Sequence, residues 1–182
     1  MGWLKKAITA LVVCIVALLV IGLFLPRDSQ FARSISIKAP PEQIYATLTD
    51  LRQFNSWSPW YAGATASYQV TGKAAEPGQQ LKWQQNDKTG DQGSMTLLES
   101  DKPGYVAFRL QFAGHDQADI SFRIRQTANG SDVTWGYFAD MGNDISDRYL
   151  GLVMEHALGP DFDKGLKALK KKEEENKPDD NG

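Results

Sequence analysis

Apolar residues follow three successive patterns along the chain, and the first is an unbroken uncharged run from Ala7 to Leu25. About 20 residues in a helix, at a rise of about 1.5 Å each, cross a hydrocarbon core of about 30 Å. Lys5 and Lys6 precede the run, and Trp3 suits the boundary between lipid and water. The pattern predicts a transmembrane anchor within residues 1–28.

A cleaved signal peptide is the alternative for this segment. Such a peptide has an apolar region of about 7–15 residues, followed by a cleavage site of small residues. The run here is longer, and Leu25-Pro26-Arg27-Asp28 offers no such site. We therefore expect the helix to be retained, and the two preceding lysines favour a cytoplasmic N-terminus with the following domain outside the cytoplasm.

The second pattern has a period of two, which is typical of strands with one buried face. Arg33 to Lys38 alternates polar and β-branched residues and predicts a first strand. Six further segments are separated by turn residues: Ser67–Thr71, Gln80–Gln85, Ser94–Ser100, Tyr105–Phe112, Ala118–Gln126 and Asp132–Phe138. Their connections are too short for crossover helices, so they predict an antiparallel meander with one apolar face that another element must cover.

The third pattern has helical spacing and occurs on both sides of the meander. Pro40-Pro41-Glu42 is typical of a helix start, and the helix leads into Asp50–Trp60, where Pro59 stops it. A second helical pattern extends from Ile145 to Lys172 and is interrupted at Gly159-Pro160-Asp161. We expect two collinear or kinked segments there, covering the sheet. Residues 173–182 are predicted to be a charged flexible tail.

Composition and short motifs exclude several classes of function. A formal net charge of −2 gives no drive toward nucleic acid. One cysteine, Cys14, and two histidines, His115 and His156, form neither an intrachain disulfide nor a zinc cluster. The chain also lacks a nucleophile elbow, a phosphate-binding loop and a dinucleotide fingerprint. We therefore expect no metal and no cofactor, and no feature specifies an oligomeric state.

A strand, a helical corner, a meander and a long last helix form a helix-grip arrangement, and on this basis the chain resembles the START-related, polyketide cyclase-like (SRPBCC) superfamily. The residues that carry the resemblance are Arg33-Ser34-Ile35, Ala39-Pro40-Pro41-Glu42, Asp50-Leu51-Arg52 through Trp57-Ser58-Pro59-Trp60, Thr134-Trp135, Arg148, Gly151-Leu152, Gly159 to Phe162, and Gly165-Leu166. The resemblance covers residues 31–172 and extends to membrane-anchored bacterial members with this layout. It implies an α+β helix-grip fold, with a curved antiparallel meander sheet wrapped around the long C-terminal helix, in a single-pass protein of the bacterial inner membrane.

The resemblance also implies an apolar cavity between sheet and helix, where aromatic side chains would meet a ligand. Aromatic rings offer large apolar areas with one N–H or O–H, which suits a hydrophobic molecule carrying one polar group. The candidate ligand-binding residues are Trp57, Trp60, Trp83, Phe108, Leu110, Trp135, Tyr137 and Met154. The alternative is that these side chains only fill the core.

Acid–base chemistry has few candidates in this sequence. His115-Asp116 with Asp119 forms the one local cluster, but this stretch is also what a hairpin turn favours. His156 lies on or beside the apolar stripe of the last helix, where a histidine within the core is the simpler interpretation. Arg148 is expected either in an ion pair at the cavity rim or capturing an anion.

Three hypotheses of function follow from these observations. The leading one is a membrane-tethered domain that binds a small hydrophobic or amphipathic ligand, lipid-like in character, with its membrane contact through residues 7–25. The second is an enzyme of the cyclase, aromatase or hydrolase type that uses His156, Asp119 or Arg148. The third is a non-catalytic module for protein interaction. We expect binding rather than catalysis, because the superfamily shares no catalytic set.

Overall fold

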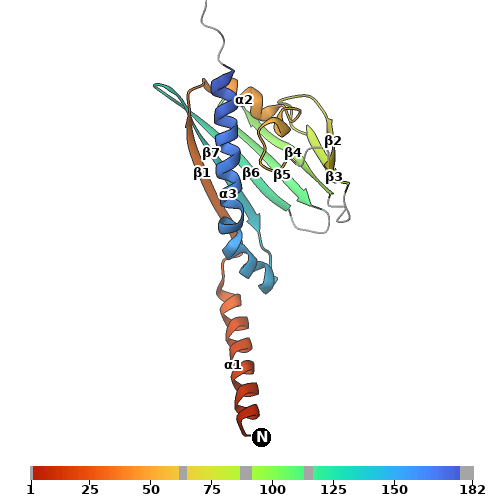
Figure 1. Cartoon of the computed structure of the whole chain (residues 1–182), viewed down its shortest axis with the longest axis vertical. Coiled ribbons are helices and arrows are strands. Elements are labelled where there is room, and N and C mark those ends of the chain that lie inside the picture. Colours follow the sequence, from red (N-terminus) through yellow and green to blue (C-terminus); the bar gives the residue numbers. More distant parts are fainter. Residues whose placement is uncertain (1, 62–64, 87–91, 113–116, 177–182) are drawn as a thin grey trace, which may run out of the picture.

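A single antiparallel sheet forms the centre of the molecule. The computed structural model describes residues 2–61, 65–86, 92–112 and 117–176. Seven strands pair in the order β1-β7-β6-β5-β4-β3-β2 (Figure 1). Their bounds are β1 Asp28–Ile37, β2 Ala66–Thr71, β3 Gln80–Gln85, β4 Gln92–Asp101, β5 Tyr105–Phe112, β6 Gln117–Thr127 and β7 Gly130–Asp140. Six of them form the expected meander, and β1 closes it by pairing with β7.

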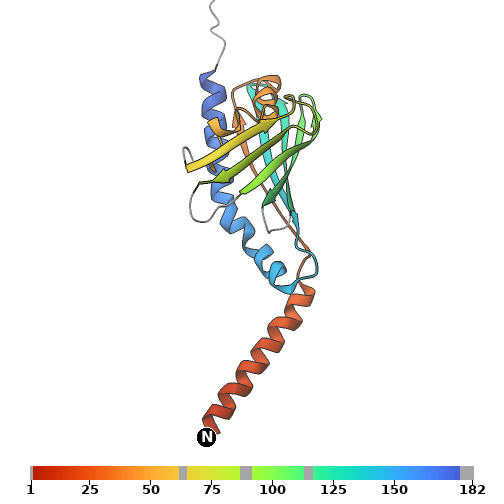
Figure 2. The same ribbon diagram turned by 90° about the vertical axis from the view of Figure 1, so that its right-hand side faces the viewer.

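A long helix, α3 (Ile145–Glu175), crosses one face of this sheet, as the two ribbon views show (Figures 1 and 2). Its contact with the sheet is close at Gly165, because a Cβ atom there would lie 2.6 Å from Trp135 Cζ3. One turn earlier, the Phe162 ring stacks on Trp135 with centroids 4.1 Å apart. Both rings are fully buried. The predicted helix-grip fold is therefore confirmed.

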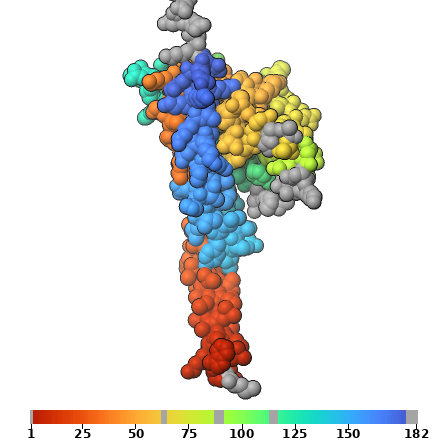
Figure 3. All heavy atoms as spheres, in the orientation of Figure 1, coloured from red at the N-terminus to blue at the C-terminus, as the bar shows by residue number. Residues whose placement is uncertain are grey.

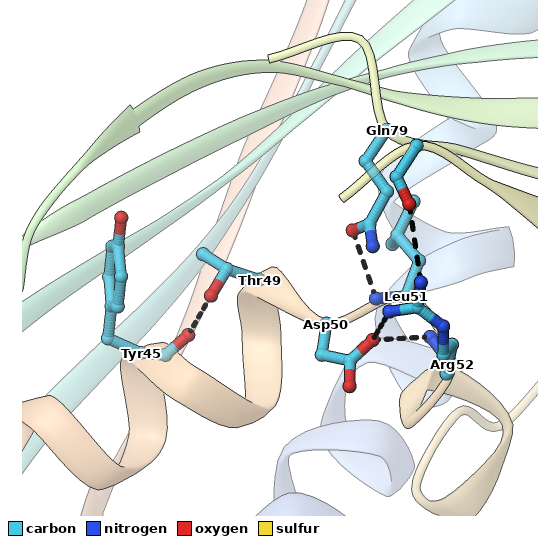
Figure 4. A network of polar contacts seen from close by, with 7 residues as sticks. Tyr45, Thr49, Asp50, Leu51, Arg52 and Gln79 are labelled. Atoms are coloured by element: carbon cyan, nitrogen blue, oxygen red, sulfur yellow. Dashed lines mark hydrogen bonds and ion pairs between the residues drawn. The ribbon is translucent and has the colours of Figure 1, made fainter. Parts of the chain in front are cut away.

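The helical corner closes one end of the sheet. It consists of α2 (Pro41–Thr49) and the short 3-10 helix η1 (Phe54–Ser56). Figure 4 shows how the end of α2 is fixed: the Leu51 amide donates to Gln79 Oε1 at 3.2 Å, and Arg52 Nη1 donates to Asp50 Oδ1 at 3.1 Å. The Asp50-Leu51-Arg52 stretch therefore joins α2 to the segment before β3 and has a structural role.

The first strand begins earlier than its pattern predicts. β1 starts at Asp28, five residues before Arg33, and pairs with β7 along its whole length. Its early inward positions include Ser29, whose Oγ donates to the Gly151 carbonyl of α3 at 2.9 Å. A polar inward residue breaks the apolar alternation, and for that reason the sequence pattern underestimated the strand.

The last helix differs from its prediction in two ways. It is one continuous helix with Pro160 inside it, where two segments were expected. It also packs on the sheet unevenly: the fully buried apolar side chains, Phe162, Leu166 and Leu169, are in its second half, whereas Met154 and Leu158 of the first half are only partly buried against the core. In its first half, Leu152 and Val153 are more than half exposed. The helix runs to Glu175, into the segment predicted as a tail, and residues 177–182 lie outside the described part of the chain.

The N-terminal helix α1 (Gly2–Phe24) projects from the domain as a separate rod (Figures 1 and 3). Among the described residues it is the one helix long and apolar enough to cross a membrane, and only 6% of its most apolar 18-residue stretch is buried against the rest of the protein. A signal sequence near an N-terminus meets the same criterion.

Candidate ligand cavity

A cavity of about 610 Å³ lies between the inner face of the sheet and α3. Inward residues of the strands form one wall, and five residues of α3 form the other. The wall of the sheet includes Leu81, Trp83, Met95, Leu110, Phe112, Ala118, Ile120 and Tyr137; that of α3 consists of Asp147, Leu150, Met154, Leu158 and Phe162. Phe54, Asn55 and Trp60 of the helical corner complete the lining.

Five of the eight candidate ligand-binding residues line this cavity, namely Trp60, Trp83, Leu110, Tyr137 and Met154. The other three, Trp57, Phe108 and Trp135, do not reach it and lie in the packed core, each exposing 3% of its surface or less. Trp57 packs edge-to-face on Trp135 with ring centroids 5.7 Å apart, so these rings fill the space beside the cavity. These three side chains therefore fill the core, which was the alternative to ligand binding.

The cavity is polar at one end and apolar in its depth. Gln85 ends β3 and Gln117 begins β6, and the strand registers place both at the end of the sheet where β1 starts and β7 ends. Asp147, in the first turn of α3, lies at the same end. Beyond Trp83 and Phe112, an apolar row consists of Leu81, Met95, Leu110 and Ala118, which follow one another across paired strands. Such a gradient suits a molecule with a polar head and an apolar body.

Two aromatic residues of the cavity wall, Trp60 and Tyr137, each carry one polar group. Trp60 Nε1 donates to Asp161 Oδ2 at 3.2 Å, which ties the helical corner to α3 at the cavity wall. Burial raises the pKa of the Tyr137 phenol above its usual value, because the anionic form is poorly solvated there. The shift moves the phenol further from neutral pH, so Tyr137 stays protonated and acts as a hydrogen-bond donor or acceptor.

Asp119 and His156, two of the predicted acid–base residues, do not face the cavity. Asp119 lies on the outer face of the sheet, where it pairs with Arg109 through two hydrogen bonds of 2.8 and 2.9 Å. This carboxylate raises the pKa of Arg109 by its hydrogen bond and its charge. His156 is exposed on α3 and is not part of the apolar stripe. His115 and Asp116 lie outside the described residues.

Arg148 donates to two backbone carbonyl groups, which no pattern in the sequence predicted. Its Nε donates to the Gly142 carbonyl at 3.3 Å, and its Nη1 donates to the Leu23 carbonyl of α1 at 3.1 Å. The next residue of α3, Tyr149, donates from its hydroxyl to the Leu18 carbonyl at 2.7 Å. The arginine therefore joins the N-terminal helix to the domain.

Sequence reasoning missed several residues of the cavity wall, including Leu81, Met95, Leu150 and Leu158. Leu81 shares the parity of Trp83 on its strand, so the alternation contained the signal for it. Leu150 and Leu158 gave no comparable signal, because helical spacing does not distinguish a cavity wall from a packed face. In the part of the chain that the structure describes, no group of three or more His, Cys, Asp and Glu side chains that could hold a metal ion is found.

Comparison with solved structures places this fold among known ones. A protein from Chromobacterium violaceum, CV1439, superimposes with a TM-score of 0.58 at 16% identity, over 82% of this chain and 99% of that one. SA2116 from Staphylococcus aureus, described as a protein of unknown function, gives 0.59 at 13% identity, over 80% of this chain and 95% of that one. The di-domain aromatase/cyclase StfQ of the steffimycin biosynthetic pathway gives 0.62 at 11% identity, over 81% of this chain and 51% of that one. At these identities the likeness shows a shared fold.

A comparison with curated proteins gives no match. A family model does match, over residues 29–174, which is nearly the whole domain that follows α1. Its description is polyketide cyclase / dehydrase and lipid transport. The chain belongs to this family.

Proposed function

We propose that this protein is a membrane-tethered domain that holds one hydrophobic or amphipathic small molecule, of a lipid-like kind, in the cavity between its sheet and α3. The observation that carries the proposal is the cavity itself. Its volume of about 610 Å³ falls within the roughly 300–1,000 Å³ of ligand pockets, and its walls are mainly apolar. The polar end offers Gln85, Gln117 and Asp147 to a headgroup.

The family description supports binding of this kind, since it names lipid transport beside cyclase and dehydrase chemistry. The positions of the candidate acid–base groups favour binding over catalysis, because Asp119 is on the outer face of the sheet and His156 is exposed on α3. The tether is α1, whose apolar surface is almost entirely exposed. A helix of this kind holds the domain at high local concentration beside lipid.

The cavity proposal is tested by native mass spectrometry of the full chain released from membranes, followed by organic extraction. We expect a stoichiometric extra mass that extracts as one lipid class. Met154→Trp places a large ring in the cavity and should abolish this mass, whereas Ala157→Trp adds the same ring on the exposed side of α3 and should preserve it. A clean unliganded mass for the wild-type chain, or full retention by Met154→Trp, would contradict the proposal.

The tether has its own test. Membranes that contain the full chain are washed with alkaline carbonate, and the N-terminus of the retained protein is sequenced. We expect the protein to stay in the membrane fraction with residues 1–28 intact. A released protein that begins after Phe24 would identify α1 as a cleaved signal sequence and would contradict the tethering part of the proposal.

A further inference from the structure

The first turns of α3 lie beside the last turns of α1. Gly22 of α1 meets Ile145 so closely that a Cβ atom at Gly22 would lie 2.3 Å from Ile145 Cγ2. The Tyr149 hydroxyl reaches the Leu18 carbonyl at 2.7 Å. Leu18 lies six residues before the end of α1, which corresponds to about 9 Å along a helix axis. The start of α3 therefore lies against the C-terminal end of α1, and the Tyr149 side chain reaches back along it (Figures 1 and 3).

The segment of α3 that follows this contact exposes large aliphatic side chains. Leu150, Leu152 and Val153 expose 52%, 56% and 51% of their surfaces. They directly follow Arg148 and Tyr149, which bind α1, and at the end of α1 Leu23 and Phe24 expose 62% and 84%. The two exposed groups together make an apolar surface on adjacent helices, of a kind that is unusual for a surface facing water.

The exposed stretch of residues 150–153 carries no charged side chain. In the turn before it, Asp147 is half-buried and lines the cavity, and Arg148 is buried and donates to the carbonyl groups of Leu23 and Gly142. The first acidic residue beyond the segment is Glu155, which pairs with Arg33 of β1 at 3.0 Å. Charged side chains on α3 therefore resume just past the apolar segment, in the direction away from α1.

The cavity opens at the same place. Leu150 is exposed and also lines the cavity, so it forms part of the mouth. Asp147 and Met141, which line the same end, are close in the chain to residues that contact α1 or its connection: the Met141 amide donates to the Arg27 carbonyl at 2.6 Å. One end of the cavity thus lies directly beside the end of α1.

We propose that the lipid bilayer occupies this apolar surface: residues 145–153 of α3 lie in the boundary between headgroups and acyl chains, and the cavity mouth opens onto that leaflet. The inference rests on the proposed function, including the tether, and it specifies the ligand as a lipid of the surrounding bilayer. Helices in this boundary bury their apolar face by about 5–10 Å, and the exposed leucines and valine of this segment supply such a face. The lipid enters with its acyl chain first and does not pass through water.

The position of the segment is tested by depth-dependent quenching. In a Cys14→Ala background, Leu152→Cys and Val153→Cys carry an environment-sensitive fluorophore, and the full chain is reconstituted in phosphatidylcholine/phosphatidylglycerol vesicles. Lipids with a nitroxide near the glycerol end of the acyl chain should quench both probes several-fold more than a probe at Leu98→Cys. Leu98 is an exposed leucine of β4 in the half of that strand remote from α1, so it is the matched control. Equal quenching at all three positions would overturn the proposal.

The route of entry is tested with a phosphatidylcholine that carries a photoactivatable diazirine on its acyl chain. In vesicles, irradiation should link this lipid to cavity residues of the wild-type chain and of Leu98→Asp, and several-fold less in Leu152→Asp/Val153→Asp. In detergent micelles, where the lipid reaches the mouth without a bilayer, all three proteins should be labelled equally. Equal labelling of all proteins in vesicles would overturn the route while leaving the binding function intact. Absence of cavity labelling in both vesicles and micelles would overturn the binding function itself.

Discussion

Arg148 of α3 donates a hydrogen bond from its guanidinium to the carbonyl oxygen of Leu23, in the last turn of α1. The last carbonyl groups of a helix have no partner within the helix, and a cation is favoured at this negative end. The contact satisfies one of these carbonyl groups and fixes the direction in which α1 leaves the domain.

Replacing this arginine should loosen the junction. Arg148→Met keeps much of the apolar stem but removes the donors to Leu23 and Gly142, so we expect a loss of about 1–3 kcal/mol in the free energy of unfolding. The measurement is thermal unfolding of the full chain in detergent, together with the rate of proteolysis between residues 25 and 27, which should rise. Arg125→Met, at a side chain that is 79% exposed, is the control and should change neither quantity. An Arg148→Met variant that unfolds and is cleaved like the wild type would contradict this role.

Gly165 allows α3 to approach the sheet, so a methyl group there should cost stability. A Cβ atom at this position meets Trp135 at 2.6 Å and Pro59 Cδ at 3.0 Å, and neither ring moves without disturbing the core. We expect Gly165→Ala to lower the free energy of unfolding by about 1–3 kcal/mol, as overpacked cores do. Gly151→Ala in the same helix meets the flexible Met141 side chain, so its midpoint in chemical denaturation should change less. An unchanged midpoint for Gly165→Ala would show that the helix can lift off the sheet at little cost.

The Tyr137 phenol should make the free energy of unfolding decrease at alkaline pH. Its pKa is raised in the folded protein, so the unfolded chain loses this proton at lower pH than the folded one. The contribution of the protonated phenol to the free energy of unfolding is therefore complete below the ordinary tyrosine pKa of about 10. It is lost as pH rises through the pKa of Tyr137 in the folded protein. Absorbance titration near 295 nm should show one phenol that ionises late, and Tyr137→Phe should remove it. If the variant titrates like the wild type, the late phenol belongs to another residue.

His156 and Asp119, two candidate acid–base residues, should be dispensable for ligand binding in the cavity. His156→Gln changes an exposed side chain of α3, and Asp119→Asn changes an ion pair on the outer face of the sheet. We expect both variants to carry the same ligand mass as the wild type, with the same occupancy in native mass spectrometry. Loss of the ligand from either variant would mean that the cavity extends to a surface where the structure does not place it.

The strands were well predicted because alternation reports burial on one face directly. Tyr105–Phe112 and Gln80–Gln85 have the same limits in the sequence pattern as in the sheet. The start of β1 was missed because Ser29 is buried through a hydrogen bond to α3, and a polar residue in such a position interrupts the pattern. Patterns of apolar residues find positions that avoid water, but not polar residues that are buried with a partner.

The cavity and the contact between α1 and α3 were harder to predict, because the spacing of apolar residues does not show what each side chain contacts. Leu152 and Val153 belong to the same helical pattern of apolar residues as Phe162 and Leu166, yet the first two are exposed and the second two are buried against the sheet. Pro160 suggested a break, but the helix continues through it, with Phe162 stacked on Trp135 just beyond it. The contacts of Arg148 with backbone carbonyl groups leave no trace in the sequence at all.

The connection between α1 and β1 has a consequence for how far the domain can travel. It comprises residues 25–27, which span at most about 10 Å, and the Arg27 carbonyl is already held by Met141. A carrier that moves a molecule between two membranes needs a linker of tens of ångströms, and the described connection between α1 and β1 is much shorter. If α1 is the tether, the domain therefore stays at the membrane surface. Transfer of its ligand to another membrane or protein then requires that the acceptor bind at this surface.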